Sequence, residues 1–339
     1  MQRPVNTLKT KQRRSGSRCL ESVFFLPVVV LLACGSTQPN TDLEKPLETP
    51  TIKTEPSLVQ LTTASKNFDG SRAWEHLRQQ VSCGPRPAGS VALAVCRNYI
   101  VQQLRSLGIL VEEQPFTETT PIGPIPMVNV IGKIQGSKND RLGIASHYDT
   151  KRFDNFRFVG ANDSGSSVAV LLELARVLTE RQNPYTIELL FFDGEESTLP
   201  QWRDPDNTYG SRYYVQSSQK QGSLTSLRTL ILLDLVGDKN LNFRREANST
   251  HWLTEIIWST AKELGYQAYF LNEVMAVEDD HIPFLRYGIP AVNIVDLDYN
   301  AWHTPADTLE AVSEQSLQIV GDVVLKALSE IEQRLASGR

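Results

Sequence analysis

Residues 186–196 of the chain read TIELLFFDGEE, and the interpretation of the whole sequence starts from this stretch. Five of its first seven residues are apolar, which is typical of a short β-strand that is covered on both faces of a sheet. Polar residues follow at once and end in two adjacent glutamates. In open α/β sheets the loops after the carboxyl ends of the strands form the functional site. The stretch therefore predicts a central strand that delivers acidic side chains to such a site.

Helical and strand-like patterns alternate on both sides of this stretch. We expect helices at 71–80, 91–107, 164–181, 209–217, 250–264, 281–287 and 313–334, and strands at 109–116, 127–134, 142–147, 186–192, 229–235, 267–271 and 290–295. Strands separated by helices predict a sheet with a parallel core and helices on both faces. No internal repeat is present, so one α/β domain over 61–339 is the simplest interpretation.

Composition and charge narrow the functional classes. The chain has 339 residues, of which 40% are hydrophobic and 22% are charged. These values exclude a polytopic membrane protein, a collagen-like chain and a fully disordered one. The formal net charge is −5, and nothing in it indicates a nucleic-acid-binding protein. Residues 1–33 hold six basic residues and one acidic residue, which leaves a body with 28 basic and 38 acidic residues.

The basic leader resembles a secretory signal. An apolar run from Val23 to Ala33 follows the basic residues, and the run is too short to span a bilayer comfortably. The sequence LLACGS at 31–36 resembles a bacterial lipobox, so we expect a signal peptide over 1–33 and a lipid on Cys34. An uncleaved signal anchor is the alternative. We therefore expect an exported lipoprotein that is anchored to a membrane and faces the periplasm or the cell exterior.

The segment after Cys34 differs from the rest of the body. Residues 34–60 are rich in proline, threonine, glutamate and lysine and show no apolar periodicity, which predicts a disordered tether. Beyond it, Cys83 and Cys96 are the remaining cysteines of an exported body. We expect a disulfide between them because they would close a short loop outside the reducing cytoplasm, a bond that contributes about 3 kcal/mol in the chain-entropy model. Two buried free thiols are the alternative.

Polar side chains follow several expected strands or begin an expected helix. They are His147, Asp149, Asp163, Glu195, Glu196, Asp234 and His303. Each alone has an ordinary explanation, since an aspartate at a helix start is commonly a cap and a pair of glutamates is commonly a solvated turn. Together they bring carboxylate and imidazole groups, which are standard zinc ligands, to one edge of the sheet. Adjacent glutamates can also point in different directions, so that one binds metal while its neighbour transfers protons.

The types and order of these residues resemble a known family, the zinc-dependent M28 peptidase-like family. The matching hallmarks are HYD at 147–149, DSG at 163–165, EE at 195–196, Asp234 and His303. Within that family the chain is most similar to glutaminyl cyclases, over about residues 70–335. The closer motifs are FFDGEE at 191–196, YGSR at 209–212, LLDLVG at 232–237, DDHIPFL at 279–285 and WHT at 302–304. The resemblance implies a zinc aminopeptidase-like α/β/α sandwich with a mixed sheet.

The resemblance implies one zinc ion per chain, bound by Asp163, Glu196 and His303. The implied substrates are peptides or proteins with glutamine at the amino terminus. Their α-amine attacks the γ-carboxamide, pyroglutamate forms and ammonia leaves. Zinc would polarise the γ-carbonyl, and Glu195 would carry the proton from the amine to the leaving ammonia. Nucleophile and electrophile belong to one residue, so attack requires only that the side chain folds correctly, and no water is consumed.

Four further site residues are implied. Asp234 and Asp279 would form a hydrogen-bonded pair beside the reacting amide, in which two close carboxylates share a proton. Trp302 and Trp202 would line the substrate pocket, although Trp202 lies slightly farther along the chain from Glu196 than in animal enzymes. We expect the protein to act as a monomer.

Two other functions stay open at this point. A zinc aminopeptidase, which hydrolyses the bond after the first residue, would use a second metal, and His147 and Asp234 resemble its ligands in two-zinc relatives. Asp279 separates the two enzymes, because related aminopeptidases commonly have serine at that position. A degenerate fold that acts only in binding is the third interpretation, but no expected ligand is missing.

Overall fold

The computed structural model describes residues 66–338. The expected signal peptide, Cys34 and the tether up to residue 60 lie outside the described residues. The described residues fall within one compact unit. No helix between residues 66 and 338 has both the length and the apolar character that a bilayer-spanning segment needs.

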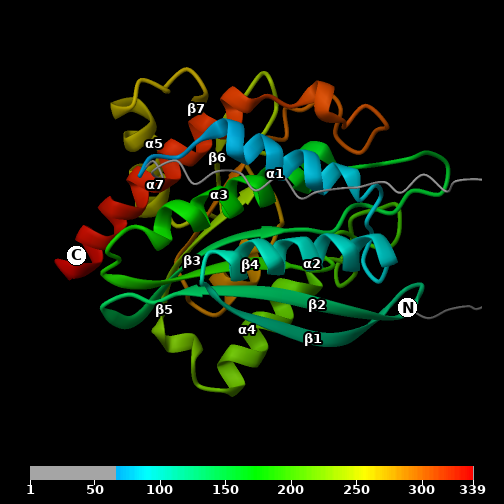
Figure 1. Cartoon of the computed structure of the whole chain (residues 1–339), viewed down its shortest axis with the longest axis horizontal. Helices are drawn as coiled ribbons and strands as arrows, with labels where there is room; N and C mark the ends of the chain where they lie inside the picture. Colours follow the sequence, from blue (N-terminus) through cyan, green and yellow to red (C-terminus); the bar gives the residue numbers. More distant parts are fainter. Residues whose placement is uncertain (1–65, 339) are drawn as a thin grey trace, which may run out of the picture. The chain divides into compact units, whose positions relative to one another are not determined.

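A six-stranded mixed sheet forms the centre of this unit (Figure 1). In spatial order its strands are β1 (Leu110–Thr120), β2 (Gly123–Ile134), β4 (Tyr185–Phe192), β3 (Lys138–His147), β5 (Leu227–Asp234) and β8 (Ala291–Val295). Strands β4, β3, β5 and β8 are parallel, which confirms the predicted parallel core. The hairpin of β1 and β2 joins this core through an antiparallel pairing of β2 with β4.

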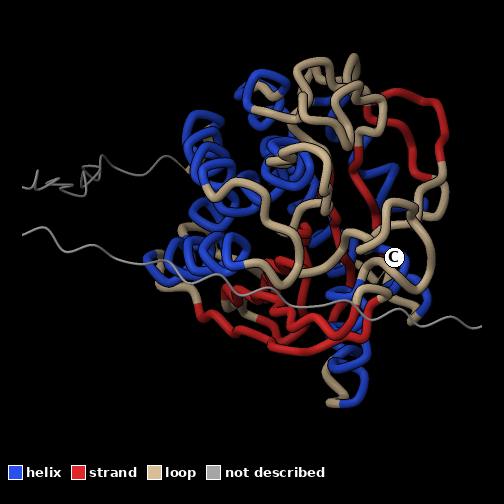
Figure 2. The backbone as a smooth tube through the Cα atoms, turned by 90° about the vertical axis from the view of Figure 1, so that its right-hand side faces the viewer, coloured by secondary structure: helices blue, strands red, loops and turns tan. Residues whose placement is uncertain are grey.

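Helices cover both faces of the sheet (Figures 1 and 2). One face carries α1 (Gly70–Ser82), α2 (Val91–Ser106), α3 (Ser167–Thr179), α5 (His251–Glu263) and α7 (Glu314–Ala336), and the other carries α4 (Tyr209–Lys220) and α6 (His281–Arg286). Short helical turns η2 (Leu224–Ser226) and η3 (Leu309–Ala311) lie in the connections. The predicted α/β/α sandwich is confirmed.

The sequence of β4 explains why it lies in the middle of two cores. Ile187, Leu189 and Phe191 pack with the helices of the first face, whereas Leu190 and Phe192 pack with α4 and α6. This division follows from the alternation of side chains along a strand. Every residue of β4 is buried, so apolar residues are needed on both of its faces.

A small parallel sheet of β6 (Phe243–Glu246) and β7 (Phe270–Met275) corrects the prediction. No strand was expected at 243–246, and β7 begins later than the expected strand at 267–271. The two strands pair only with each other and lie outside the central sheet. β6 has two arginines in its centre and is only four residues long, so it lacks the apolar pattern that identifies the longer strands.

Cys83 and Cys96 are free thiols in the structure, so the expected disulfide is not formed there. Cys83 follows α1, and Cys96 is buried in α2. Cys83 Sγ donates a hydrogen bond of 3.6 Å to the Gln79 carbonyl, Cys96 Sγ donates one of 3.1 Å to Gln80 Oε1, and the neighbouring Cys96 thiol lowers the pKa of the Cys83 thiol to about 7. The disulfide remains a prediction.

Oxidation of the protein should join Cys83 to Cys96 and raise the free energy of unfolding by about 3 kcal/mol, because the bond restricts the unfolded chain. Thiol titration of the unfolded protein should give two more thiols after reduction than before it. Denaturant unfolding of the oxidised and reduced forms measures the stability difference, and Cys83→Ser should remove that difference. Equal thiol counts before and after reduction would contradict the disulfide.

Candidate metal centre and active site

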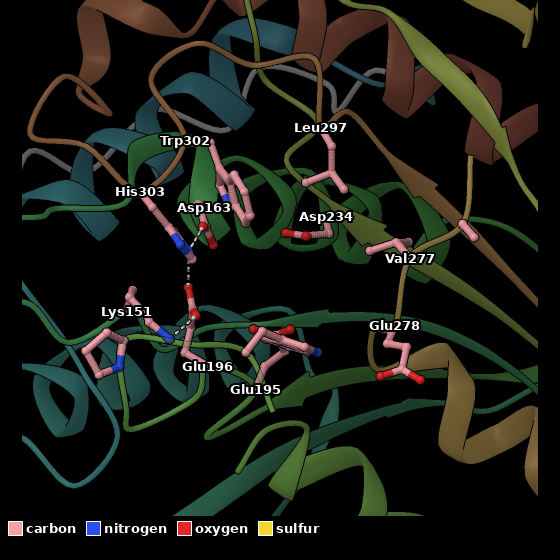
Figure 3. Close-up of a pocket in the computed structure, with 13 residues that line it drawn as sticks. Lys151, Asp163, Glu195, Glu196, Asp234, Val277, Glu278, Leu297, Trp302 and His303 are labelled. Atoms are coloured by element: carbon pink, nitrogen blue, oxygen red, sulfur yellow. Dashed lines mark hydrogen bonds and ion pairs between the residues drawn. The ribbon is translucent and has the colours of Figure 1, made fainter. Parts of the chain in front are cut away.

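The carboxyl ends of the parallel strands open into a cavity of about 360 Å³ (Figure 3). This volume lies within the range of about 300–1,000 Å³ that is usual for small-molecule sites. Seven of the eight expected site residues line the cavity: Asp163, Glu195, Glu196, Trp202, Asp234, Trp302 and His303. Asp279 is buried and does not belong to the lining. The structure therefore brings together residues that are spread over most of the folded chain.

Asp163 lies in an irregular helical turn, η1 (Ala161–Ser166), that precedes α3. The regular helix starts at Ser167, later than expected. Gly160, before the turn, has a φ of +52°, and a Cβ there would lie 1.9 Å from the carbonyl oxygen of Asp163. Only glycine fits this position without strain. The carboxylate of Asp307 accepts hydrogen bonds from the backbone N–H groups of Asn162 and Asp163 at 2.8 and 3.2 Å, which fixes the turn from another segment.

The two adjacent glutamates follow β4 and point in different directions (Figure 3). The buried carboxylate of Asp149 accepts hydrogen bonds from the backbone N–H groups of both, at 3.1 Å for Glu195 and 3.4 Å for Glu196. Glu196 Oε1 lies 3.1 Å from His303 Nε2, whereas Glu195 Oε2 lies 3.9 Å from His147 Nδ1. The turn therefore separates a carboxylate at the ligand group from a second carboxylate beside it.

Asp163, Glu196 and His303 form a compact group of potential metal ligands. His303 Nε2 lies 3.2 Å from Asp163 Oδ2 and 3.1 Å from Glu196 Oε1. Tetrahedral zinc with bonds of about 2.0–2.1 Å separates its ligand atoms by roughly 3.3 Å, so the observed distances fit that ion. The ring of Trp302 stacks on His303 with centroids 4.4 Å apart, which helps to hold the imidazole in place.

A second group shares Asp163 with the first. His147 Nε2 lies 3.3 Å from Asp163 Oδ1 and 3.3 Å from Asp234 Oδ1. Asp163 thus presents one carboxylate oxygen to each histidine. Asp149 Oδ1 lies 3.5 Å from the other nitrogen of His147. The spacing of this second group also fits a metal ion, and the two groups together fit a pair of ions that share Asp163.

Carboxyl groups predominate in the buried part of the site. Burial raises the pKa of Glu195 well above its ordinary value, and burial also raises the pKa of Glu196. Burial, together with the nearby charge of Asp279, raises the pKa of Asp234 to about 7. For His303 burial lowers the pKa, but the carboxylates of Glu196 and Asp163 outweigh it and raise the pKa to about 10. Such a concentration of buried carboxyl groups is stabilised by a cation, and a divalent metal ion fits this requirement.

The expected hydrogen bond between Asp234 and Asp279 is not present among the described residues. Asp234 contacts His147, whereas Asp279 Oδ2 accepts a hydrogen bond of 2.7 Å from the Asn293 side chain. The two carboxyl groups interact through their charges instead, because Asp279 raises the pKa of both Asp234 and Glu195. Asp279 therefore affects the carboxyl groups of the cavity through its charge, although its side chain does not line the cavity.

Several residues of the site were not expected from the sequence. Lys151 is buried in the cavity wall, donates to the Ser197 carbonyl at 2.8 Å, and places Nζ 3.6 Å from Glu196 Oε2. Asn293 holds Asp279, and it is a polar residue inside the apolar strand β8. That position carried a usable signal, because a buried polar side chain needs a partner. No comparable signal in the sequence marks Lys151.

Comparisons with known proteins show the family to which the chain belongs. The model of peptidase family M28 matches residues 129–328. The glutaminyl-peptide cyclotransferase of Drosophila melanogaster is 30% identical over 300 residues, which cover 80% of this chain and 82% of that protein. A glutaminyl cyclase from an Acidobacteriales bacterium has a similar structure, with a TM-score of 0.76, 36% identity, and coverage of 83% of this chain and 99% of that chain. A Zn-dependent exopeptidase from Parabacteroides distasonis is also similar, with a TM-score of 0.72, 26% identity, and coverage of 77% and 98%.

Proposed function

The chain belongs to peptidase family M28 and to its glutaminyl-peptide cyclotransferase group of acyltransferases, and on this premise we propose how its acidic cavity works. The enzyme converts the amino-terminal glutamine of peptides or proteins to pyroglutamate and releases ammonia. The position of Glu195 carries the proposal. It is a buried carboxyl with a raised pKa beside both groups of potential ligands, and it belongs to neither of them.

The proposed cofactor is one zinc ion held by Asp163, Glu196 and His303. The distances within this group and its mixed oxygen and nitrogen donors support zinc. Glu196 Oε2 is buried and makes no hydrogen bond among the described residues, where it contacts Lys151 Nζ at 3.6 Å. When bound, zinc supplies a Lewis acid that polarises the γ-carboxamide of the substrate.

The chain's own residues then perform the proton transfer. Burial raises the pKa of Glu195 well above its ordinary value, and a carboxyl with a raised pKa can both accept and donate a proton in an acid–base reaction. Glu195 accepts the proton of the attacking α-amine and delivers it to the leaving nitrogen. Trp202 and Trp302 line the cavity and are 37% and 45% exposed, so they form an apolar rim around the entering side chain. The attacking α-amine and the γ-carboxamide belong to the same residue, so the reaction does not require a water molecule to enter the cavity.

Asp279 is the proposed positioning residue of the reaction. Its carboxylate accepts a hydrogen bond from Asn293, and its charge adds to burial, which is the main cause of the raised pKa of Glu195. A neighbouring negative charge opposes ionisation of Glu195 and therefore keeps a proton available for the leaving group. This role replaces the direct hydrogen bond to Asp234 that the resemblance implied.

Substitution of Asp279 by serine should slow cyclisation about 10- to 100-fold without changing the fold, a loss below the full contribution of an acid–base group. The missing charge should also lower the pKa of Glu195, so the limb of the pH–rate profile due to this group should move to lower pH. Ammonia release over a pH series measures both effects, with circular dichroism to report folding. The matched control is Asp140→Ser. Asp140 lies near the amino-terminal end of β3, whereas the cavity lies at the carboxyl ends of the parallel strands. An unchanged rate and pH profile would remove Asp279 from the mechanism.

One experiment separates cyclisation from peptide hydrolysis. The purified protein is incubated with a Gln-initiated and a Leu-initiated peptide, and the products are identified by mass. Loss of ammonia from the first peptide alone supports the cyclotransferase. Release of a free amino acid from either peptide would show an aminopeptidase, for which the second ligand group would hold a second metal ion.

A further inference from the structure

Glu278 is a charged residue of the cavity that the proposed reaction does not use. It lines the cavity and is exposed, whereas Asp163 and Glu196 are buried. Figure 3 shows Glu278 on the opposite side of the cavity from His303 and Glu196. Its carboxylate therefore lies at the open part of the site and away from the group of potential metal ligands.

The charge of Glu278 is not neutralised within the described part of the chain. No hydrogen bond or ion pair engages its carboxylate there. Lys151 is the only lysine or arginine among the described residues of the lining, and it is buried against Ser197 and Glu196. A full negative charge thus faces the solvent and any substrate that enters.

The backbone around Glu278 is held on both sides. The N–H group of Val277 donates a hydrogen bond of 3.3 Å to Glu246 Oε1, and the backbone carbonyl of Asp279 accepts one of 2.9 Å from the N–H group of Ile282. Glu246 and Asp279 are both buried. Because the backbone is fixed, binding orders only the side chain of Glu278 and not the segment that carries it, which favours its use in recognition.

We propose that Glu278 selects substrates that carry lysine or arginine immediately after the amino-terminal glutamine. This inference rests on the proposed function. The γ-amide must reach the buried ligand group, so the remainder of the peptide leaves through the exposed part of the cavity. That part carries Trp202, Trp302 and Glu278. The side chain of the second substrate residue lies at this rim, where a lysine or arginine would form an ion pair with the carboxylate of Glu278.

The test compares three peptides that differ only in the second residue, which is lysine, norleucine or glutamate. For the unchanged protein we expect kcat/KM to fall about threefold at each step in that order, since exposed ion pairs are weak. The difference should appear in KM, because an ion pair remote from the reacting atoms contributes equally before and in the transition state. It should disappear at about 1 M salt, where the Debye length is only about 3 Å.

Variants assign the effect to one carboxylate. Glu278→Gln should bring the lysine-to-norleucine ratio close to one, and Glu278→Lys should reverse the order of the three peptides. Glu273→Gln is the matched control, because Glu273 is an exposed glutamate of β7 outside the cavity lining and its removal should leave the ratio unchanged. Equal turnover of the three peptides by the unchanged protein, or an unaltered ratio in Glu278→Gln, would overturn the inference. Failure to cyclise even the norleucine peptide would instead overturn the proposed function itself.

Discussion

Replacement of Glu195 by glutamine should reduce turnover by about 100- to 10,000-fold while the protein keeps its fold and its metal. Glutamine has nearly the shape of glutamate but cannot accept the proton of the attacking amine. The Glu195 carboxylate has no hydrogen-bond partner among the described residues, so the amide breaks no such bond. Because Glu195 belongs to neither group of potential ligands, its loss should not remove a metal contact.

The neighbouring residue provides the matched control. Glu196→Gln changes the same functional group one position along the chain, but it alters a carboxylate that lies 3.1 Å from His303 Nε2. We expect Glu196→Gln to lose both metal and activity, and Glu195→Gln to lose activity alone. Metal analysis of the dialysed proteins, with ammonia release from a Gln-initiated peptide, distinguishes these patterns. Normal turnover in Glu195→Gln would exclude Glu195 as the proton carrier.

The same turn shows why this part of the site was predictable from the sequence. The apolar run before Glu195 forms a strand that is buried on both faces, and its short length distinguishes it from a buried helix. A strand of this kind places the residues after it at the carboxyl edge of the sheet. By contrast, β6 was not predicted, because it is only four residues long and its two central arginines leave no apolar pattern that would indicate a strand.

Residues that only hold other residues in place were the least predictable. Asp307 contacts the backbone of Asp163 across 144 positions of the chain, and no local pattern specifies such a contact. The partner of Asp279 depends on where its side chain ends, and among the described residues its carboxylate accepts a hydrogen bond from Asn293 and makes none with Asp234. Residue types at strand ends predict which groups meet, whereas the distances between them depend on packing between distant segments.

Removal of the His303 side chain should lower zinc affinity by more than about 100-fold, because even the partners that orient metal ligands contribute 10- to 100-fold. His303 supplies the only nitrogen of the proposed ligand group and lies between the carboxylates of Asp163 and Glu196. Without the imidazole, an alanine variant has only carboxylate ligands left in this group. Activity should fall with the metal content.

Thermal unfolding provides a readout that does not depend on turnover. Zinc binds the folded protein through residues that are brought together only by folding, so it should raise Tm in a concentration-dependent way. Treatment with a chelator should lower Tm, and added zinc should restore it in the unchanged protein but much less in His303→Ala. His251→Ala is the control, since His251 is exposed on α5 and distant in sequence from the ligand group. An equal zinc-dependent shift in His303→Ala and His251→Ala would remove His303 from the metal site.

The stoichiometry of the same titration decides between the two ligand groups. One zinc ion per chain at full activity would assign the metal to Asp163, Glu196 and His303, and His147 would remain a partner of Asp163 and Asp234. Two ions would fill both groups, because Asp163 presents a separate oxygen to each histidine. In that case His147→Ala should lose one ion and His303→Ala the other. A chain that reaches full cyclisation activity with one ion, and does not hydrolyse a Leu-initiated peptide, uses the second group only for charge and orientation.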